Sequence, residues 1–110
     1  MKAKLEARCP IRTSLEMLGG KWRLLILHQV SEGNHRFGEL KRNIPEISEK
    51  MLTQELKFLT QSDLLIRKNY GEVPPRVEYS LNELGEEAVK LIDPIASFGE
   101  GYLSSLQGRS

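Results

Sequence analysis

The 110-residue chain is poor in cysteine and aromatic residues, carries little net charge, and has no long apolar run. Its single cysteine, Cys9, excludes a disulfide within the chain and is typical of proteins from a reducing compartment. No apolar run approaches the roughly 20 residues that a membrane-spanning helix needs. Residues 1–12 also lack the apolar core of a secretory signal, so we expect a cytoplasmic protein with no membrane partner.

The length of the chain allows one modest hydrophobic core, so residues 1–110 are expected to form a single domain. The formal net charge of +1 indicates nothing by itself, but the charge is unevenly distributed. Residues 1–81 carry 14 Lys and Arg against 10 Asp and Glu, whereas residues 82–110 carry 2 against 5. A polyanionic partner would therefore face the first part of the chain rather than its acidic end.

Residues 36–81 begin with the pattern of two amphipathic helices separated by a tight turn. The first helix is expected at residues 37–42, and Pro45 prevents its continuation because proline has no N–H and restricts the preceding residue. The second helix is expected to begin at Ser48, whose hydroxyl can cap a helix N-terminus. Four apolar residues around the turn are expected to pack into the core: Phe37, Leu40, Ile44 and Ile47.

The same stretch ends with the pattern of a hairpin. Residues 65–70 form an extended basic run, residues 71–75 contain turn residues, and residues 76–81 alternate between apolar and polar. Helix, turn, helix and hairpin in this order predict an α+β, mostly α fold, the winged helix-turn-helix with a two-stranded wing. The known use of this fold is to read double-stranded DNA.

The second helix has one polar face and one apolar face. At about 100° per residue, Leu52, Leu56 and Leu59 fall on the side opposite the polar residues. Lysine, hydroxyl and amide groups suit phosphates and base edges, although a merely solvated face is the alternative. Glu55 falls in the apolar stripe, where burial without a partner is costly, so we expect a cation beside it. The candidate DNA-reading residues are Ser48, Lys50, Thr53, Gln54 and Lys57.

Three cationic residues cluster on or near the predicted hairpin: Arg67, Lys68 and Arg76. They are candidates for a clamp on the DNA backbone, and ordinary solvated charges are the alternative. A third class of function, a winged-helix protein-interaction module without DNA readout, also remains open. The basic wing and the two lysines of the second helix favour DNA.

Two further helices are expected before this stretch. Cys9 and Pro10 open the first, at about residues 9–19, and the glycines at 19 and 20 end it. The second is expected to begin at residues 21–22 and to end at Gly33. It is expected to be the most buried helix, through Trp22, Leu25, Ile26, Leu27 and Val30.

The C-terminal segment, residues 83–106, carries more apolar surface than so small a monomer can cover. Asn82 is a good N-cap, and Pro94 is expected to interrupt the helical pattern. Unmatched apolar surface usually marks a partner, so we expect a homodimer, with packing inside the chain as the alternative. The candidate dimerisation residues lie on the first and last helices: Ile11, Leu15, Leu91, Ile95, Phe98 and Tyr102.

No catalytic, metal or cofactor site is predicted. Cys9, His28 and His35 are the raw material for such sites, and their spacing matches no standard metal motif. Gly20 and Lys21 suggest a phosphate-binding loop, but Leu15 stands where its first glycine belongs and Trp22 where Ser or Thr should bind Mg²⁺.

Over about residues 9–100, six motifs in order resemble the HxlR-type transcriptional regulators of bacteria. The motifs are Cys9-Pro10, Gly19-Gly20-Lys21-Trp22, Arg36-Phe37 with Glu39-Leu40, Ile47-Ser48 with Lys50-Met51-Leu52-Thr53, residues 73–79 (VPPRVEY), and Leu84-Gly85. The resemblance implies a winged-helix homodimer on a pseudo-palindromic operator, paired through its terminal helices. Two positions depart from the family pattern, because Phe98 stands where tryptophan is frequent and Asn82 where threonine is usual.

The resemblance also implies a candidate redox sensor, because some members of the family sense thiol-reactive compounds with the cysteine before the proline. Cys9 matches that position. Lys4, Arg8, Arg12 and a helix N-terminus could favour its thiolate. A lone cysteine is often an inert small hydrophobe, so both readings stay open, as does a small effector or a thiol oxidant as a partner.

Overall fold

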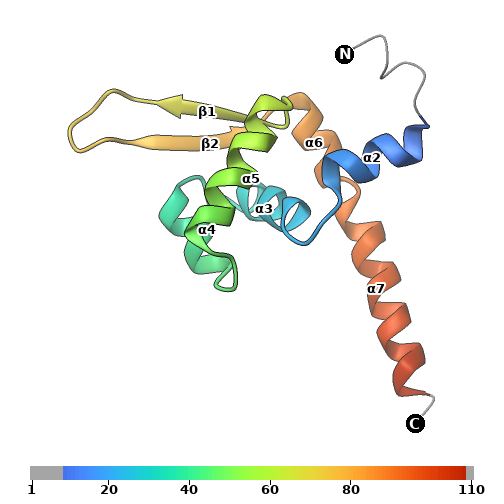
Figure 1. Cartoon of the computed structure of the whole chain (residues 1–110). Helices are drawn as coiled ribbons and strands as arrows, with labels where there is room; N and C mark the ends of the chain where they lie inside the picture. Colours follow the sequence, from blue (N-terminus) through green and yellow to red (C-terminus); the bar gives the residue numbers. More distant parts are fainter. Residues whose placement is uncertain (1–8, 109–110) are drawn as a thin grey trace.

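The computed structural model describes residues 9–108, so Lys4 and Arg8 lie outside the described part (Figure 1). The elements within residues 9–108 are α2 (Pro10–Leu18), α3 (Arg23–Ser31), α4 (Phe37–Asn43), α5 (Glu49–Gln61), β1 (Leu65–Asn69), β2 (Val77–Leu81), α6 (Glu83–Val89) and α7 (Ile92–Gln107). The fold is therefore mostly helical, with a two-stranded antiparallel hairpin, and the predicted winged helix-turn-helix is confirmed.

The core is formed where α3, α4 and α5 meet. Its fully enclosed side chains are aliphatic: Ile26, Leu27, Val30, Leu40, Ile47, Leu52, Leu56, Leu59 and Leu65. Ile44 is also buried, and Phe37 packs against this cluster, so all four apolar residues expected around the turn face the core. The expectation for Leu25 was wrong, because it is 48% exposed. One face of a helix cannot bury several consecutive apolar residues.

Both strands of the hairpin are anchored to the helical part of the fold, β1 through the buried side chain of Leu65. β1 and β2 pair from Leu65 opposite Leu81 to Asn69 opposite Val77. The backbone N–H of Tyr79 donates to the carbonyl of His35 at 2.8 Å, and the ring Nδ1 of His35 lies 2.9 Å from the carbonyl oxygen of Tyr79. These contacts fix the base of the wing beside the start of α4.

Helix α6 lies close against the start of the wing. The side chain of Asn82 accepts a hydrogen bond from the backbone N–H of Glu83 at 2.6 Å, which confirms the predicted cap. The backbone N–H of Asn82 donates to the carbonyl of Leu64 at 3.2 Å. Gly85 is buried there, and a Cβ atom at this position would collide with the same carbonyl. This close approach requires glycine.

The break between the last two helices does not lie at Pro94, so that prediction was wrong. Helix α6 ends at Val89 and α7 begins at Ile92, which places Pro94 in the first turn of α7. A first-turn N–H has no partner within its helix, so proline is tolerated there.

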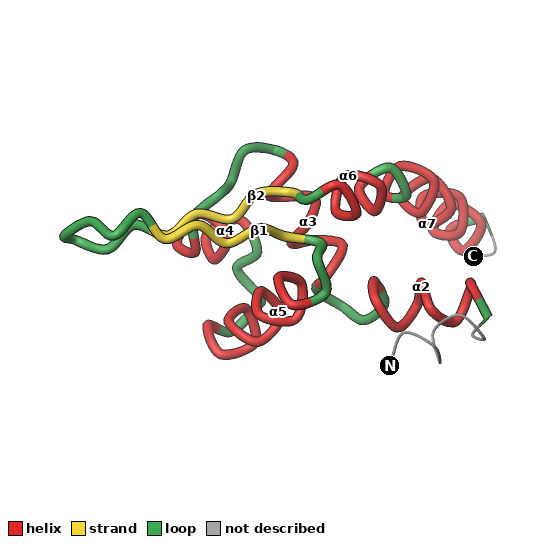
Figure 2. The backbone as a smooth tube through the Cα atoms, turned by 90° about the horizontal axis from the view of Figure 1, so that it is seen from above, coloured by secondary structure: helices red, strands yellow, loops and turns green. Residues whose placement is uncertain are grey.

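The wing and the terminal helices extend on opposite sides of the core. Figures 1 and 2 both show the hairpin projecting to one side, and α2 and α7 on the other. The principal extents are 56 × 39 × 23 Å. Among the described residues, no helix is long and apolar enough to cross a membrane.

Candidate nucleic-acid interface

Helix α5 presents a polar face because its opposite face is anchored in the core. Ser48 accepts a hydrogen bond from the backbone N–H of Met51 at 3.0 Å, which fixes the first turn. Leu52, Leu56 and Leu59 are at most 1% exposed. All five candidate DNA-reading residues consequently lie at the surface: Ser48, Lys50, Thr53, Gln54 and Lys57.

A groove of about 410 Å³ joins this face to the wing. Thr53 and Lys57 from α5 line it together with Arg67 from β1, and Tyr79 of β2 forms part of its wall. The structure therefore brings three of the predicted residues into one concavity. The remaining candidates on α5 and the wing lie outside its lining.

The other two cations of the wing are engaged within the hairpin. The guanidinium of Arg76 lies 3.7 Å from the centre of the Tyr70 ring and 3.0 Å from the carboxylate of Glu72. The ammonium of Lys68 lies 4.6 Å from the centre of the same ring, and Lys68 pairs across the hairpin with Glu78. The Tyr70 hydroxyl donates to Glu78 at 3.0 Å, and this hydrogen bond raises the pKa of Tyr70. Of these three wing cations, Arg67 alone lines the groove beside the polar face of α5.

Glu55 has the cationic partner that the sequence predicts. Arg23 Nε donates to Glu55 Oε2 at 2.7 Å, and the two side chains are 20% and 16% exposed. The same guanidinium lies 3.6 Å from the centre of the Phe58 ring. Arg23 comes from the first turn of α3, 32 residues away along the chain. The carboxylate therefore enters the apolar side of α5 without being left unpaired.

Arg36 is a further cation near the wing that sequence reasoning missed. Its side chain is 51% exposed and lies 3.8 Å from the carboxylate of Glu78. The sequence feature that could have identified Arg36 is its position immediately before α4. Glu39 caps this helix by accepting hydrogen bonds from the backbone N–H groups of His35 and Arg36 at 2.9 and 3.0 Å. These two hydrogen bonds lower the pKa of Glu39.

The terminal helices expose their apolar side chains. Helices α2 and α7 lie wholly within the described residues, and neither contains a buried residue. Each of the six candidate dimerisation residues is at least 44% exposed: Ile11, Leu15, Leu91, Ile95, Phe98 and Tyr102. Cys9 is exposed and is the N-cap residue of α2.

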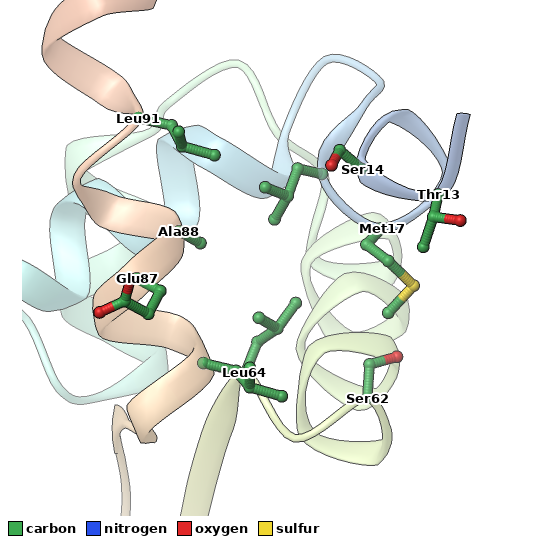
Figure 3. Close-up of a pocket in the computed structure, with 10 residues that line it drawn as sticks. Thr13, Ser14, Met17, Ser62, Leu64, Glu87, Ala88 and Leu91 are labelled. Atoms are coloured by element: carbon green, nitrogen blue, oxygen red, sulfur yellow. The ribbon is translucent and has the colours of Figure 1, made fainter. Parts of the chain in front are cut away.

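Two hollows lie beside these helices. One, of about 370 Å³, is bounded by Met17 of α2, by Ser62 and Leu64 after α5, and by Ala88 of α6 (Figure 3). The other, of about 190 Å³, lies between α2 and the start of α7 and includes Leu15 and Ile95. Over residues 9–108 there is no group of three or more metal-ligating side chains.

Comparisons with known proteins place the chain in a family. A model described as HxlR-like helix-turn-helix matches residues 17–107. MalR of Fusobacterium mortiferum, described as a regulatory protein, is 43% identical over 101 residues, which cover 91% of this chain and 95% of MalR.

Two solved structures are similar to this chain over most of its length. A transcriptional regulator from Porphyromonas gingivalis, described as a MarR family member, is 55% identical with a TM-score of 0.75 and covers 86% of this chain and 92% of its own. The redox regulator HypR in its reduced form is 33% identical with a TM-score of 0.83, over 91% and 99%. The match of the family model and these likenesses agree with the geometry of α5 and the wing. The chain therefore belongs to the HxlR-like helix-turn-helix family of transcriptional regulators, and it is not an enzyme.

Proposed function

We propose that the protein is a sequence-specific regulator that binds double-stranded DNA as a homodimer on a pseudo-palindromic operator. The observation that carries this proposal is the outward face of α5, called the recognition helix below. Its cationic, hydroxyl and amide groups are exposed because three buried leucines hold the opposite face in the core. A helix with this surface fits the major groove of a duplex.

The residues of the recognition helix have different roles in this proposal. Lys50, Thr53 and Gln54 read base edges, since their side chains can donate to or accept from the groove edges of the bases. Lys57, on the wing side of the helix, binds a phosphate. Ser48 orders the first turn, whose free N–H groups favour a nearby phosphate.

The wing holds the DNA backbone beside the recognition helix. Arg67 shares the groove with Thr53 and Lys57, so it lies where the backbone next to the major-groove contact would pass. Lys68 and Arg76 add positive charge along the hairpin. Because Arg76 already pairs with Glu72, its contribution is smaller than that of Arg67.

The dimer forms through α2 and α7, called the dimerisation helices below, with the whole chain acting as one domain. Their apolar side chains form an exposed stripe, in which the rings of Phe98 and Tyr102 stack with centroids 6.4 Å apart. An exposed apolar surface of this kind usually marks a partner. A second copy sets the two recognition helices about 34–36 Å apart, one turn of duplex, or a multiple of that distance.

The salt dependence of duplex binding tests this function against the alternative of a winged-helix protein-interaction module. Binding to a duplex should weaken steeply as salt rises, because each phosphate contact releases counterions. Lys57→Ala should weaken binding to all duplexes and reduce the slope by about one phosphate contact. Lys90→Ala, at the residue that follows α6, is the matched control and should change neither the affinity nor the slope. A protein that binds no duplex, or whose affinity ignores salt, would favour the interaction module.

We further propose that DNA binding responds to thiol oxidation at Cys9. The thiol is exposed at the N-terminus of a dimerisation helix, where a small oxidant can reach it. The related HypR is named a redox regulator and is known in oxidised and reduced forms. The chain holds no second cysteine, so a disulfide must join Cys9 to a small thiol or to the partner's Cys9, with the oxidant accepting two electrons and two protons.

The test compares DNA affinity with and without diamide as the oxidant, in the parent protein and in Cys9→Ser. Oxidation should change the affinity of the parent and leave Cys9→Ser unchanged. Equal affinities in all four measurements would remove the sensing proposal and leave DNA binding intact.

A further inference from the structure

We propose that Arg23 is a positioning residue that couples the dimerisation helix α2 to the recognition helix α5, and so determines which half-site separation the dimer accepts. The inference rests on the proposed DNA-binding function. It adds to that function a specific physical link between the dimerisation helix α2 and the recognition helix α5.

One guanidinium reaches both helices. Arg23 Nε donates to the carboxylate of Glu55 on α5 at 2.7 Å. Its Nη1 donates to the carbonyl oxygen of Glu16 at 2.6 Å and lies 3.5 Å from that of Met17, both in the last turn of α2. The group also stacks over Phe58 of α5 at 3.6 Å. A guanidinium is a rigid plane of donors, so these contacts fix the end of α2 against one side of α5.

Helix α2 is only partly packed against the rest of the chain. The hollow of about 370 Å³ lies between Met17 of α2 and Ala88 of α6, as Figure 3 shows. No residue of α2, all of which is described, is buried. The last turn of α2 therefore meets α5 through the polar contacts of Arg23, beside the packing of Leu18 against the core.

The link is partly screened from water. The side chains of Arg23 and Glu55 are only 20% and 16% exposed, and the aromatic ring of Phe58 covers one face of the guanidinium. Ion pairs at fully exposed sites contribute little, whereas partly buried and hydrogen-bonded pairs hold their geometry more firmly. The last carbonyls of α2 also carry the negative end of the helix dipole, which favours a cation there.

The consequence concerns spacing along the DNA. The dimer interface sets the direction of α2, and both recognition helices must meet the major groove at a fixed separation. If Arg23 carries the direction of α2 to α5, its loss should broaden the range of accepted separations. A residue that merely stabilised the fold would lower the affinity for every separation equally.

The test uses duplexes that carry two selected half-sites separated by spacers of increasing length. Arg23→Gln removes the positive charge. Arg23→Lys keeps the charge, but its single ammonium group cannot contact both helices as the planar guanidinium does. Lys90→Gln is the control, because it breaks an exposed ion pair with Glu87 on α6. Wild type and Lys90→Gln should keep the same preference for the best spacer over its neighbours. Both Arg23 variants should lose about fivefold of that preference or more, as expected for a typical coupling between sites.

Arg23→Lys should retain the pair with Glu55 and a folded dimer, so the experiment stays decisive even if Arg23→Gln does not fold. An equal loss of affinity at all spacers, an unchanged preference, or a preference fully restored by lysine would overturn the inference.

Amide hydrogen exchange on the free protein tests the same link without DNA. In both Arg23 variants, exchange should become faster in the last turn of α2 and around Glu55 together, and it should be unchanged in Lys90→Gln. Faster exchange in only one helix, or in neither, would contradict the coupling. Failure of the wild type to bind any duplex would overturn the proposed function, while this measurement would still decide whether Arg23 joins the two helices.

Discussion

Substitutions at Leu52 and Gln54, two positions apart in α5, should distinguish the reading of DNA from the stability of the fold. Leu52 is 0% exposed, and Gln54 is exposed on the opposite side of the helix. Leu52→Ala removes a fully enclosed side chain, which costs about 2–5 kcal/mol through lost burial and the cavity left behind. Gln54→Ala removes no core contact and should change the stability by about 0.5 kcal/mol or less.

The two substitutions should have the opposite order of effect on the discrimination between DNA sequences. If Gln54 reads one base pair, Gln54→Ala should reduce discrimination at that position by about 1–3 kcal/mol, because one side-chain contact to a base edge is lost. This corresponds to a change of about 5- to 140-fold in relative affinity. Leu52→Ala should lower the population of folded protein and leave the preference among sequences unchanged.

The assay combines thermal unfolding with fluorescence anisotropy. The affinity of each variant is measured at fixed salt for the selected duplex and for duplexes in which one base pair has been changed. Gln54→Ala should unfold near the wild-type temperature, and Leu52→Ala should unfold about 10 °C lower or more. If Gln54→Ala discriminates every base pair as wild type does, Gln54 does not read the sequence. If it unfolds far below wild type, the division of α5 into two faces is wrong.

Three further predictions follow from the described contacts. Gly85→Ala should lower the free energy of unfolding by about 1–3 kcal/mol in a denaturant titration, because the new Cβ meets a backbone carbonyl. Gly38→Ala has room for its Cβ and should raise the free energy of unfolding by up to about 1 kcal/mol. Equal effects of the two substitutions would refute the close approach at Gly85. The folded-state pKa of Glu39 is lowered from 4.5, so its stabilising effect is present above that pH and is lost as the pH falls through the lowered pKa. Glu39→Gln should therefore be less stable than wild type at pH 7 and approach it as the pH falls through the lowered pKa, and a constant difference between the unfolding temperatures would show that no such shift exists. Phe98→Ser should weaken self-association in sedimentation measurements, while Val73→Ser at the exposed wing tip should not; an unchanged association constant would remove α7 from the interface.

The sequence predicted best what depends on local pattern. The hydroxyl at Ser48, the amide at Asn82 and the spacing of the leucines in α5 determine where helices begin and which face is buried, and the structure confirms all three. These features depend on residues within one or two helical turns of each other.

The sequence could not predict what depends on distant residues or on the exact start of a helix. It required a cation beside Glu55, but Arg23 could be identified only once α3 and α5 were placed side by side. The effect of Pro94 was misjudged because α7 begins two residues before it rather than after it. The engagement of Arg76 with Tyr70 and Glu72 depends on the fold of the hairpin tip, which charge pattern alone does not determine.

Selection of bound duplexes from a random pool tests the paired-reading proposal most directly. The expected result is enrichment of two inverted half-sites whose centres lie about 10–10.5 base pairs apart, or a multiple of that, matching one recognition helix from each copy. Enrichment of a single isolated half-site would contradict the homodimer. The absence of any enriched sequence would contradict the proposal that the exposed face of α5 reads DNA.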